Sequence, residues 1–252
     1  MKLKTLTLSL ALAAFSLGAM AQGLSVEQLN RSNSSIQLGN SQKKFLMLPI
    51  EEGAPEARLK VIIDNHQEKS FTARLARTHV DYCLPVDLSQ YRGKLVSIDV
   101  RHAESAQEGK ADVWVSNLSL TDVFDTANKD QWRPDFHHTP EYAWMNDPNG
   151  MFYLDGTWHL YYQYGPYGNM WNNMHWGHST STDLINWKHE PVALEPDVLG
   201  DIFSGSCVVD HNNTAGFGKG AIIALYTSAG EAAQRQSMAY STDGGKTFKK
   251  YA

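Results

Sequence analysis

The chain has 252 residues and a formal net charge of −5 at pH 7, from 22 basic and 27 acidic side chains. It contains no dense patch of lysine or arginine, so its composition argues against nucleic-acid binding and favours a neutral substrate. The two cysteines, Cys83 and Cys207, lie far apart in the sequence. In an oxidising compartment they could form a disulfide, but two buried free thiols are the favoured interpretation.

Residues 1–21 have the features of an export signal. Lys2 and Lys4 give a positive start, and the apolar run over residues 6–17 is too short to span a bilayer. An Ala-Met-Ala cleavage pattern precedes Gln22, and no cysteine follows it, so a lipid anchor is not indicated. The sequence predicts a secreted or periplasmic protein without a membrane-spanning helix.

Short alternating runs predict a small β-sandwich over residues 22–130, after a loose polar leader at residues 22–35. The runs are KFLMLPI, RLKVIID, SFTARLA, KLVSIDVRH and ADVWVSNLSL, each of strand length and bounded by turn-forming residues. In SFTARLA, Phe71 and Ala73 share one face while Thr72 and Arg74 share the other. The region has no aromatic platform, so packing against the rest of the chain is favoured over polysaccharide binding.

Residues 131–252 have a different character, because aromatic residues crowd into the sequence from Tyr142 onwards. Asp155-Gly156 joins two strand-like runs and is a strong hairpin signal. The triplet Ser-Thr-Asp occurs at residues 181–183 and again at residues 241–243, each time before an aromatic residue and a lysine. This repeat predicts two four-stranded propeller blades, at about Trp144–Leu194 and Phe203–Tyr251.

The stretch WMNDPNG, residues 144–150, predicts a turn. Asp147, Pro148, Asn149 and Gly150 have the chemistry of a tight turn, in which backbone amides would stabilise the Asp147 carboxylate. Such a turn would also present Asp147 rigidly. The sequence around it leaves two interpretations open, because aromatic residues interleaved with Asn, Asp, Gln and Ser suit either a propeller core or a sugar-binding pocket.

Three other motifs carry weaker signals. The run GFGKG at residues 216–220 precedes a strand-like run, which favours a plain loop over a phosphate-binding loop. His175 and His178 have no acidic or sulfur partner at zinc-site spacing, so neither a metal nor another cofactor is predicted. Ser204 and Cys207 are possible nucleophiles without an obvious base.

Several motifs together resemble glycoside hydrolase family 32, which includes invertases, levanases and inulinases. The resemblance runs from about residue 133 to the end of the chain. The motifs that carry it are RPDFHHTPEYAWMNDPNG, YYQYGP, MHWGHSTSTDLINW and FSGSCVVD, in the order typical of the family. Gly165 departs from the family's more usual Gln-Tyr-Asn-Pro. The strand-rich region before these motifs resembles, more weakly, an extra N-terminal domain of some Bacteroidetes members.

The resemblance implies an all-β chain with part of a five-bladed β-propeller, about the first two blades. It implies a retaining hydrolase of β-D-fructofuranosidic bonds in sucrose or fructans, with Asp147 as the nucleophile. A retaining glycosidase pairs such a nucleophile with a second carboxyl group acting as acid and base. The implied sugar-binding residues are Trp144, Asn146, Gln163, Trp171, Phe203 and Ser204.

Two further acids of the family pattern are expected but not found. Neither the Asp of an Arg-Asp-Pro motif nor the Glu of a Glu-Cys motif occurs after residue 150, and Glu190, Glu195 and Glu231 lack the second motif. The sequence therefore predicts an N-terminal fragment that is nearly inactive alone. A non-catalytic carbohydrate-binding protein or inactive remnant is the alternative. An arabinanase-like hydrolase fits the WMNDPNG and FSGS motifs less well.

Overall fold

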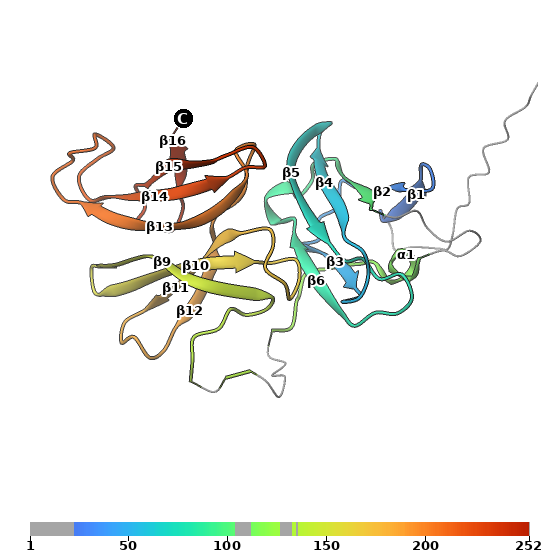
Figure 1. The fold of residues 1–252 in the computed structure, drawn as a ribbon, viewed down its shortest axis with the longest axis horizontal. Helices are drawn as coiled ribbons and strands as arrows, with labels where there is room; N and C mark the ends of the chain where they lie inside the picture. The colour runs from blue at the N-terminus through green and yellow to red at the C-terminus, as the bar shows by residue number, and fades with distance from the viewer. Residues whose placement is uncertain (1–22, 104–111, 127–132, 135, 252) are drawn as a thin grey trace, which may run out of the picture.

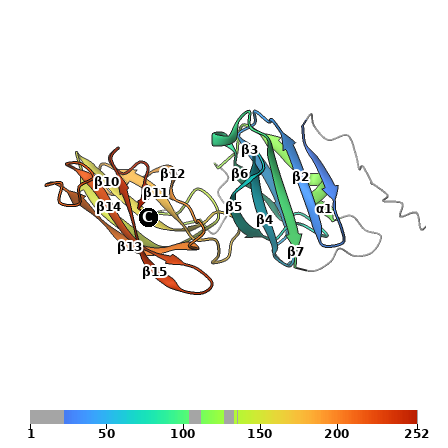
Figure 2. The ribbon, with the colours of Figure 1, turned by 90° about the horizontal axis from the view of Figure 1, so that it is seen from above.

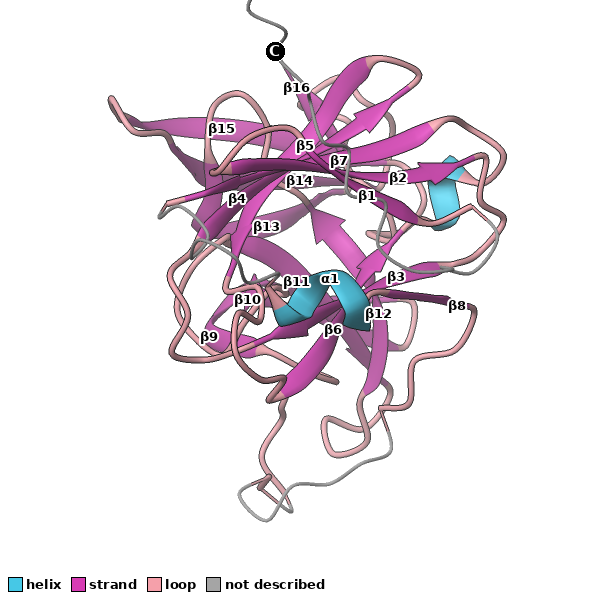
Figure 3. Ribbon diagram, turned by 90° about the vertical axis from the view of Figure 1, so that its right-hand side faces the viewer, coloured by secondary structure: helices cyan, strands magenta, loops and turns pink. Residues whose placement is uncertain are grey.

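The computed structural model describes residues 23–103, 112–126, 133–134 and 136–251. The predicted export signal lies outside these ranges. The described chain forms two β-rich halves that lie side by side (Figures 1 and 2), and strands account for nearly all of its regular structure (Figure 3). The predicted fold class, a sandwich followed by propeller blades, is confirmed.

The first half is a sandwich of two antiparallel sheets. A five-stranded sheet has the order β1-β2-β7-β4-β5 and a three-stranded sheet has the order β6-β3-β8. Their bounds are β1 Ser25–Gln28, β2 Asn33–Gly39, β3 Phe45–Ile50, β4 Ala57–Ile63, β5 His66–Ala73, β6 Tyr82–Asp87, β7 Val96–His102 and β8 Ser119–Thr121, with a 3₁₀ turn at Ser89–Tyr91. Side chains of both sheets, including Ile36, Leu48 and Ile98, meet in one fully buried core.

Two predictions for this half are wrong. The loose leader predicted at residues 22–35 is not observed, because its described part, residues 23–35, contains β1 and the start of β2. Asn30 Oδ1 accepts hydrogen bonds from the amides of Ser32 and Asn33, which closes the turn between the two strands. The buried Ser35 hydroxyl donates to Asp99 on β7, so a polar sequence is satisfied inside a sheet.

The run at residues 111–120 is not one strand either. It forms helix α1, Val113–Asn117, followed by the short strand β8. One helical turn places Trp114 and Leu118 on the same side, where they are 1% and 7% exposed. Burial of these two side chains in the sandwich core outweighs the β preference of the neighbouring valines.

The second half contains two four-stranded antiparallel sheets, each with its strands in sequence order. The first blade consists of β9 Trp144–Leu154, β10 Thr157–Gly165, β11 His175–Ser181 and β12 Lys188–Leu194. The second consists of β13 Asp201–Asp210, β14 Ala221–Ala229, β15 Gln234–Ser241 and β16 Lys249–Tyr251. These bounds agree closely with the predicted blades. The sheets pack face to face through a core that includes Tyr161, Trp176, Ile222 and Tyr226 (Figure 1).

Local turn chemistry explains several of the connections between strands within each blade. Asp155 and Gly156 both have positive φ, 47° and 83°, and Leu154 pairs with Thr157, so the predicted hairpin is confirmed. Each Ser-Thr-Asp triplet forms the same closed turn, in which the serine hydroxyl donates to the aspartate. Within the described residues, no helix has the length and hydropathy that crossing a membrane requires.

Candidate active site

Asp147 lies within strand β9 and not in the turn that its sequence predicts. Tyr162 of β10 pairs with Pro148, and Tyr164 pairs with Met145. Two residues of β9, Asn146 and Asp147, therefore lie opposite the single residue Gln163 of β10. This extra residue is a β-bulge, which tilts the side chains it carries away from the regular pleat. β9 is an edge strand of its sheet, which is where a strand tolerates a proline such as Pro148.

A second irregularity follows three residues later, at Gly150. The pairing shifts between His159 and Tyr161 of β10, and Gly150 has φ +48°. A Cβ atom there would lie 2.7 Å from Cys207 Sγ and 3.0 Å from the rings of Trp176 and Tyr161. Glycine is therefore required both by the backbone conformation and by the close approach of the second blade.

Ser204 lies at a matching irregularity on β13. Phe203 pairs with Thr227 and Gly205 pairs with the next residue, Tyr226, so Ser204 is the extra residue of a bulge. The Ser204 hydroxyl donates a hydrogen bond of 2.9 Å to Asp147 Oδ2. Both side chains are exposed to solvent. The first strands of the two blades thus present a carboxylate and a hydroxyl together on an open surface.

Three side chains of the first blade hold β13 on either side of Ser204. Gln163 Nε2 donates to the Ile202 carbonyl at 2.9 Å, and Trp176 Nε1 donates to the Phe203 carbonyl at 3.1 Å. Asn149 Oδ1 accepts from the Gly205 amide at 3.2 Å. All three donor or acceptor side chains are buried. These bonds fix the position of Ser204 relative to Asp147.

The predicted sugar-binding residues therefore fall into two groups. Asn146, Trp171, Phe203 and Ser204 lie at or beside the exposed surface, together with Trp144, whose Nε1 donates to Asn146 Oδ1 at 2.9 Å. Gln163 lies beneath that surface, is 2% exposed and is bonded to the backbone of β13. The sugar-binding role of Gln163 stays a prediction. In the structure, its side chain holds the backbone of β13.

The aromatic residues Trp171 and Phe203 meet at the edge of this surface. Trp171 lies in the loop between β10 and β11, and Phe203 lies on β13. Their ring centroids are 5.6 Å apart at an interplanar angle of 63°. Trp171 remains 53% exposed, so one face of its ring is open to a ligand.

Sequence reasoning missed the parts played by Asn149 and Trp176. Asn149 was interpreted only as a turn former, and Trp176 only as one of many aromatic residues. A signal for Asn149 was its place within the same motif as Asp147. Trp176 carried no separate signal, because its indole N–H bonds to a backbone carbonyl 27 residues further along the chain.

The alternative nucleophile and the candidate metal ligands are disfavoured. Both cysteines are free, and burial raises the pKa of Cys207 to about 12, so its thiol is neutral at pH 7. His178 is buried and its ring bonds that of His159 at 3.1 Å. Within the described ranges, no group of three or more His, Cys, Asp or Glu side chains is arranged to hold a metal ion.

The glutamates of the second half have other partners. Glu190 on β12 accepts from Thr180 and Lys188, at the far edge of the first blade from β9. Glu195 Oε2 lies 3.6 Å from Lys69 Nζ of the sandwich, and Glu231 Oε1 lies 3.6 Å from Arg58 Nη2, so both form ion pairs. None of the three is bonded to Asp147 in the described structure.

Comparison with protein families divides the chain at residue 136. Residues 137–252 match the model of the glycosyl hydrolases family 32 N-terminal domain. Residues 31–136 match a domain of unknown function, DUF4980.

Curated relatives match the second half of the chain at high identity. A levanase of Bacillus subtilis (strain 168) is 56% identical over 135 residues, which cover 52% of this chain and 20% of the relative. An invertase of Schwanniomyces occidentalis is 46% identical over 149 residues, covering 55% and 27%. An extracellular exo-inulinase of Meyerozyma guilliermondii is 48% identical over 144 residues, covering 53% and 28%. This chain thus spans less than a third of the length of each.

Solved structures give matches over the same region. A fructofuranosidase from Schwanniomyces occidentalis in complex with fructose is 48% identical, with a TM-score of 0.45 over 46% of this chain and 25% of that one. An exo-inulinase from Aspergillus awamori is 44% identical, with a TM-score of 0.46 over 49% and 28%. On the family model and the sequence identities, the part of the chain from residue 137 onwards belongs to glycosyl hydrolases family 32.

Proposed function

We propose that this chain is the N-terminal part of an exported retaining glycoside hydrolase that cleaves β-D-fructofuranosidic bonds in fructans or sucrose. The observation that carries the proposal is the position of Asp147, exposed on a bulged strand and hydrogen-bonded at 2.9 Å to Ser204 of the next blade. The levanase, invertase and exo-inulinase relatives support this substrate class.

In this proposal Asp147 is the nucleophile. A carboxylate oxygen attacks C2 of the terminal fructose, the bond from C2 to the leaving oxygen breaks, and a fructosyl ester forms. Ser204 holds the carboxylate through its hydroxyl, while Trp144, Asn146, Trp171 and Phe203 bind the sugar. Water then releases fructose with the same anomeric configuration.

The acid/base glutamate and the transition-state-stabilising aspartate would come from sequence beyond residue 252. Without a general acid, the leaving alcohol departs unprotonated, which typically costs about 10²–10⁴-fold in rate. The chain 1–252 alone is therefore expected to turn over sucrose, inulin and levan very slowly. The two halves, residues 22–130 and 131–252, would be separate domains following an export signal at residues 1–21.

The test compares two substrates in the longer protein that contains this chain. Fructosyl fluoride needs no proton donor, because fluoride leaves with the bonding electrons. Asp147→Asn should lose at least about 10⁴-fold in rate on both sucrose and fructosyl fluoride, since the nucleophile itself is missing. A matched control is Asp155→Asn, at a hairpin position with φ +47° that asparagine adopts readily.

Two outcomes would contradict the proposal. Asp147→Asn that is inactive on sucrose but active on the fluoride would assign Asp147 as the acid/base instead. Full activity of Asp147→Asn on both substrates would exclude Asp147 as the nucleophile. The alternative class, a carbohydrate-binding protein, predicts instead that the wild-type protein binds fructose and releases no fluoride.

A further inference from the structure

The loop at residues 166–174 connects the proposed sugar site to the sandwich. It joins β10 to β11 and carries Trp171, whose ring contacts Phe203 on the site side. On its other side the loop meets β5, the terminal strand of the five-stranded sheet and the one nearest to the blades (Figure 2). Trp171 itself is 53% exposed, so its side chain does not anchor the loop in a buried core. The position of the loop therefore depends on the contacts of its other residues.

Asn173 bonds to β5 as a neighbouring strand would. The Thr72 amide donates to Asn173 Oδ1 at 2.8 Å, and Asn173 Nδ2 donates to the Thr72 carbonyl at 2.9 Å. Thr72 is on the open edge of its sheet, so these two groups have no strand partner there. Asn173 has φ +51° and is 9% exposed, which suits asparagine in a buried left-handed position.

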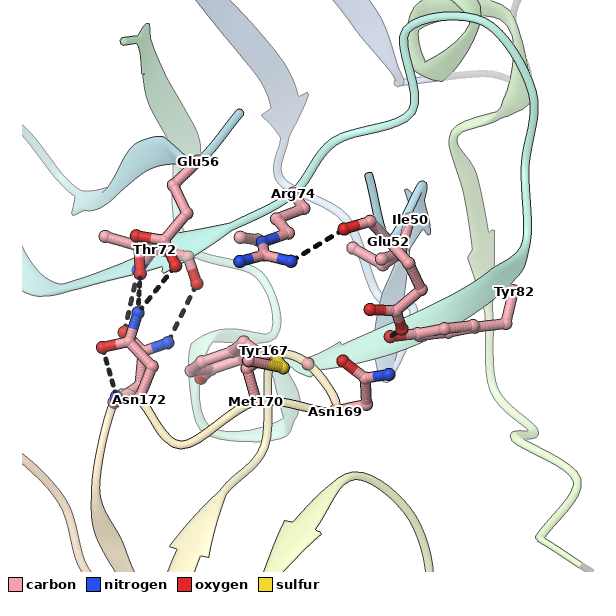
Figure 4. Close-up of a pocket in the computed structure, with 13 residues that line it drawn as sticks. Ile50, Glu52, Glu56, Thr72, Arg74, Tyr82, Tyr167, Asn169, Met170 and Asn172 are labelled. Carbon is pink, nitrogen blue, oxygen red and sulfur yellow. Dashed lines mark hydrogen bonds between the residues drawn. The ribbon is translucent and has the colours of Figure 1, made fainter. Parts of the chain in front are cut away.

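Three further contacts join the same surfaces, and Figure 4 draws the two that Asn172 makes. Asn172 Nδ2 donates to Thr72 Oγ1 at 2.6 Å and to Glu56 Oε1 at 3.1 Å. The ring of Tyr167 stacks on Phe71 of β5, with centroids 3.8 Å apart and an interplanar angle of 18°. Tyr167 is 7% exposed and belongs to the hydrophobic core of the sandwich.

The interface is packed and leaves little room for a ligand. The cavity between the loop and the sandwich, bordered by Glu52, Arg74, Tyr82 and Met170, has a volume of about 20 Å³. That space is on the order of one water molecule. The contact surface therefore fits a mechanical support better than a second binding site.

Gly165, the last residue of β10, allows the loop to fold back closely against it. A Cβ atom at residue 165 would lie 2.6 Å from the Asn172 carbonyl oxygen and 3.1 Å from Met174 Cε. This is the position at which the sequence departs from the Gln-Tyr-Asn-Pro pattern. An asparagine there would push the loop away from its present path and so from Thr72.

The loop is also bonded to the strand that carries Phe203 and Ser204. Asp201 Oδ2 accepts from the Met174 amide at 3.1 Å, and the Ile202 amide donates to the Met174 carbonyl at 2.8 Å. A displacement of residues 172–174 would therefore move Trp171 relative to β13, which Gln163, Trp176 and Asn149 of the first blade still hold in place.

We propose that the sandwich positions the sugar site. In this inference, Thr72 on β5 holds Asn172 and Asn173, and this contact keeps Trp171 against Phe203. Thr72, Asn172 and Asn173 are positioning residues, since they act through Trp171. The inference rests on the proposed function, because it assigns Trp171 to sugar binding.

The test uses two single variants in the longer protein that contains this chain. Thr72→Val removes the hydroxyl that accepts from Asn172, and Asn173→Asp replaces the donor to the Thr72 carbonyl by a repelling oxygen. Trp171 contacts the sugar in the ground state and the transition state alike, so its displacement should raise KM and leave kcat within twofold. One lost hydrogen bond predicts a rise in KM of roughly 2–10-fold for Thr72→Val, and Asn173→Asp should exceed it.

Two controls separate positioning from general destabilisation. Thr72→Ser keeps the hydroxyl and should have the wild-type KM. Thr121→Val removes a hydroxyl on β8 of the sandwich that bonds the backbone of Val123 and has no contact with the loop among the hydrogen bonds of the described residues. This variant should leave KM unchanged.

A second measurement does not depend on activity. Hydrogen exchange followed by mass spectrometry should show faster exchange of residues 166–174 in Thr72→Val and Asn173→Asp, but not in Thr121→Val. Unchanged exchange in the loop, or an unchanged KM in both variants, would overturn the positioning role. A wild-type protein that releases no fructose would overturn the proposed function alone, and the exchange measurement would still decide whether the sandwich holds the loop.

Discussion

Gly150 lies on β9 where the first blade faces the second. Replacing it by alanine should lower the free energy of unfolding for two separate reasons. Alanine at φ +48° costs about 1–2 kcal/mol, and a Cβ atom 2.7 Å from Cys207 Sγ adds about 1–3 kcal/mol of overpacking. Gly156→Ala is the matched control, because Gly156 has φ +83° and open space around it. Urea unfolding should show a larger loss for Gly150→Ala than for Gly156→Ala; equal losses would refute close packing at residue 150.

Ser204 is expected to orient the Asp147 carboxylate. Ser204→Ala removes the 2.9 Å hydrogen bond and frees the carboxylate to rotate, which should lower kcat on fructosyl fluoride by roughly 3–10-fold. Ser206→Ala is the control, since Ser206 is also exposed on β13 but pairs regularly with Leu225. Initial rates of fluoride release provide the measurement, and equal rates for the two variants would remove Ser204 from the site.

At the level of single residues, the sequence singled out Asp147 as a candidate but predicted the wrong backbone conformation for it. Asp-Pro-Asn-Gly has turn chemistry, yet these residues continue a strand, because β10 pairs with them on one side and β13 contacts them on the other. A bulge instead of a turn presents Asp147. Local residue preferences do not contain these long-range contacts, so the turn prediction failed while the candidate residue remained.

The two Ser-Thr-Asp turns are equivalent elements, and each contains an aspartate whose lowered pKa makes the stability of the fold depend on pH. Burial raises the pKa of Asp243, but hydrogen bonds from Ser241, Thr247 and the backbone outweigh it and lower the pKa from 3.8 to about 2. Backbone and side-chain bonds from Asn186 hold the pKa of Asp183 well below its usual value in the same way. Depressed carboxyl pKa values stabilise the folded state above pH 4, and this stabilisation is lost as the pH falls towards 2.

Asp243→Asn should therefore cost less stability at pH 3 than at pH 6. The free energy of unfolding in urea, measured for both proteins at the two pH values, gives this difference directly, and solvent exposure of Asp243 keeps it small. Asp155→Asn serves as the control. A difference that stays constant or grows on acidification would show that the turn does not depend on the ionised carboxylate.

Elements with a strong local pattern were predictable, and those set by packing were not. The Asp155-Gly156 hairpin and the bounds of both blades follow from turn residues and the repeat. Helix α1 could not be foreseen, because it forms where Trp114 must enter the sandwich core. Strands β1 and β2 were missed because their sequence is polar, and the partner that satisfies the buried Ser35, Asp99, lies far away in the sequence.

Across the whole molecule, the two halves share part of one core. Tyr167 follows β10 of the first blade but stacks on Phe71 inside the sandwich. Tyr167→Ala should destabilise the sandwich by about 3–5 kcal/mol, as removal of other buried aromatic residues does. Tyr153→Ala, at a residue 53% exposed on β9, should cost far less.

Hydrogen exchange of β3 and β4 in the sandwich tests this coupling. Faster exchange of these strands in Tyr167→Ala, but not in Tyr153→Ala, would show that the halves are stabilised together. Equal exchange in both variants would mean that the sandwich is stable without the loop.

The central claim is that Asp147 forms the covalent bond to fructose. Brief reaction of the longer protein with fructosyl fluoride, followed by acid quenching and peptide mass spectrometry, tests it most directly. The account predicts one added fructosyl group on the peptide that contains Asp147, and none in Asp147→Asn. A fructosyl group on another carboxylate, or the same adduct in Asp147→Asn, would contradict it.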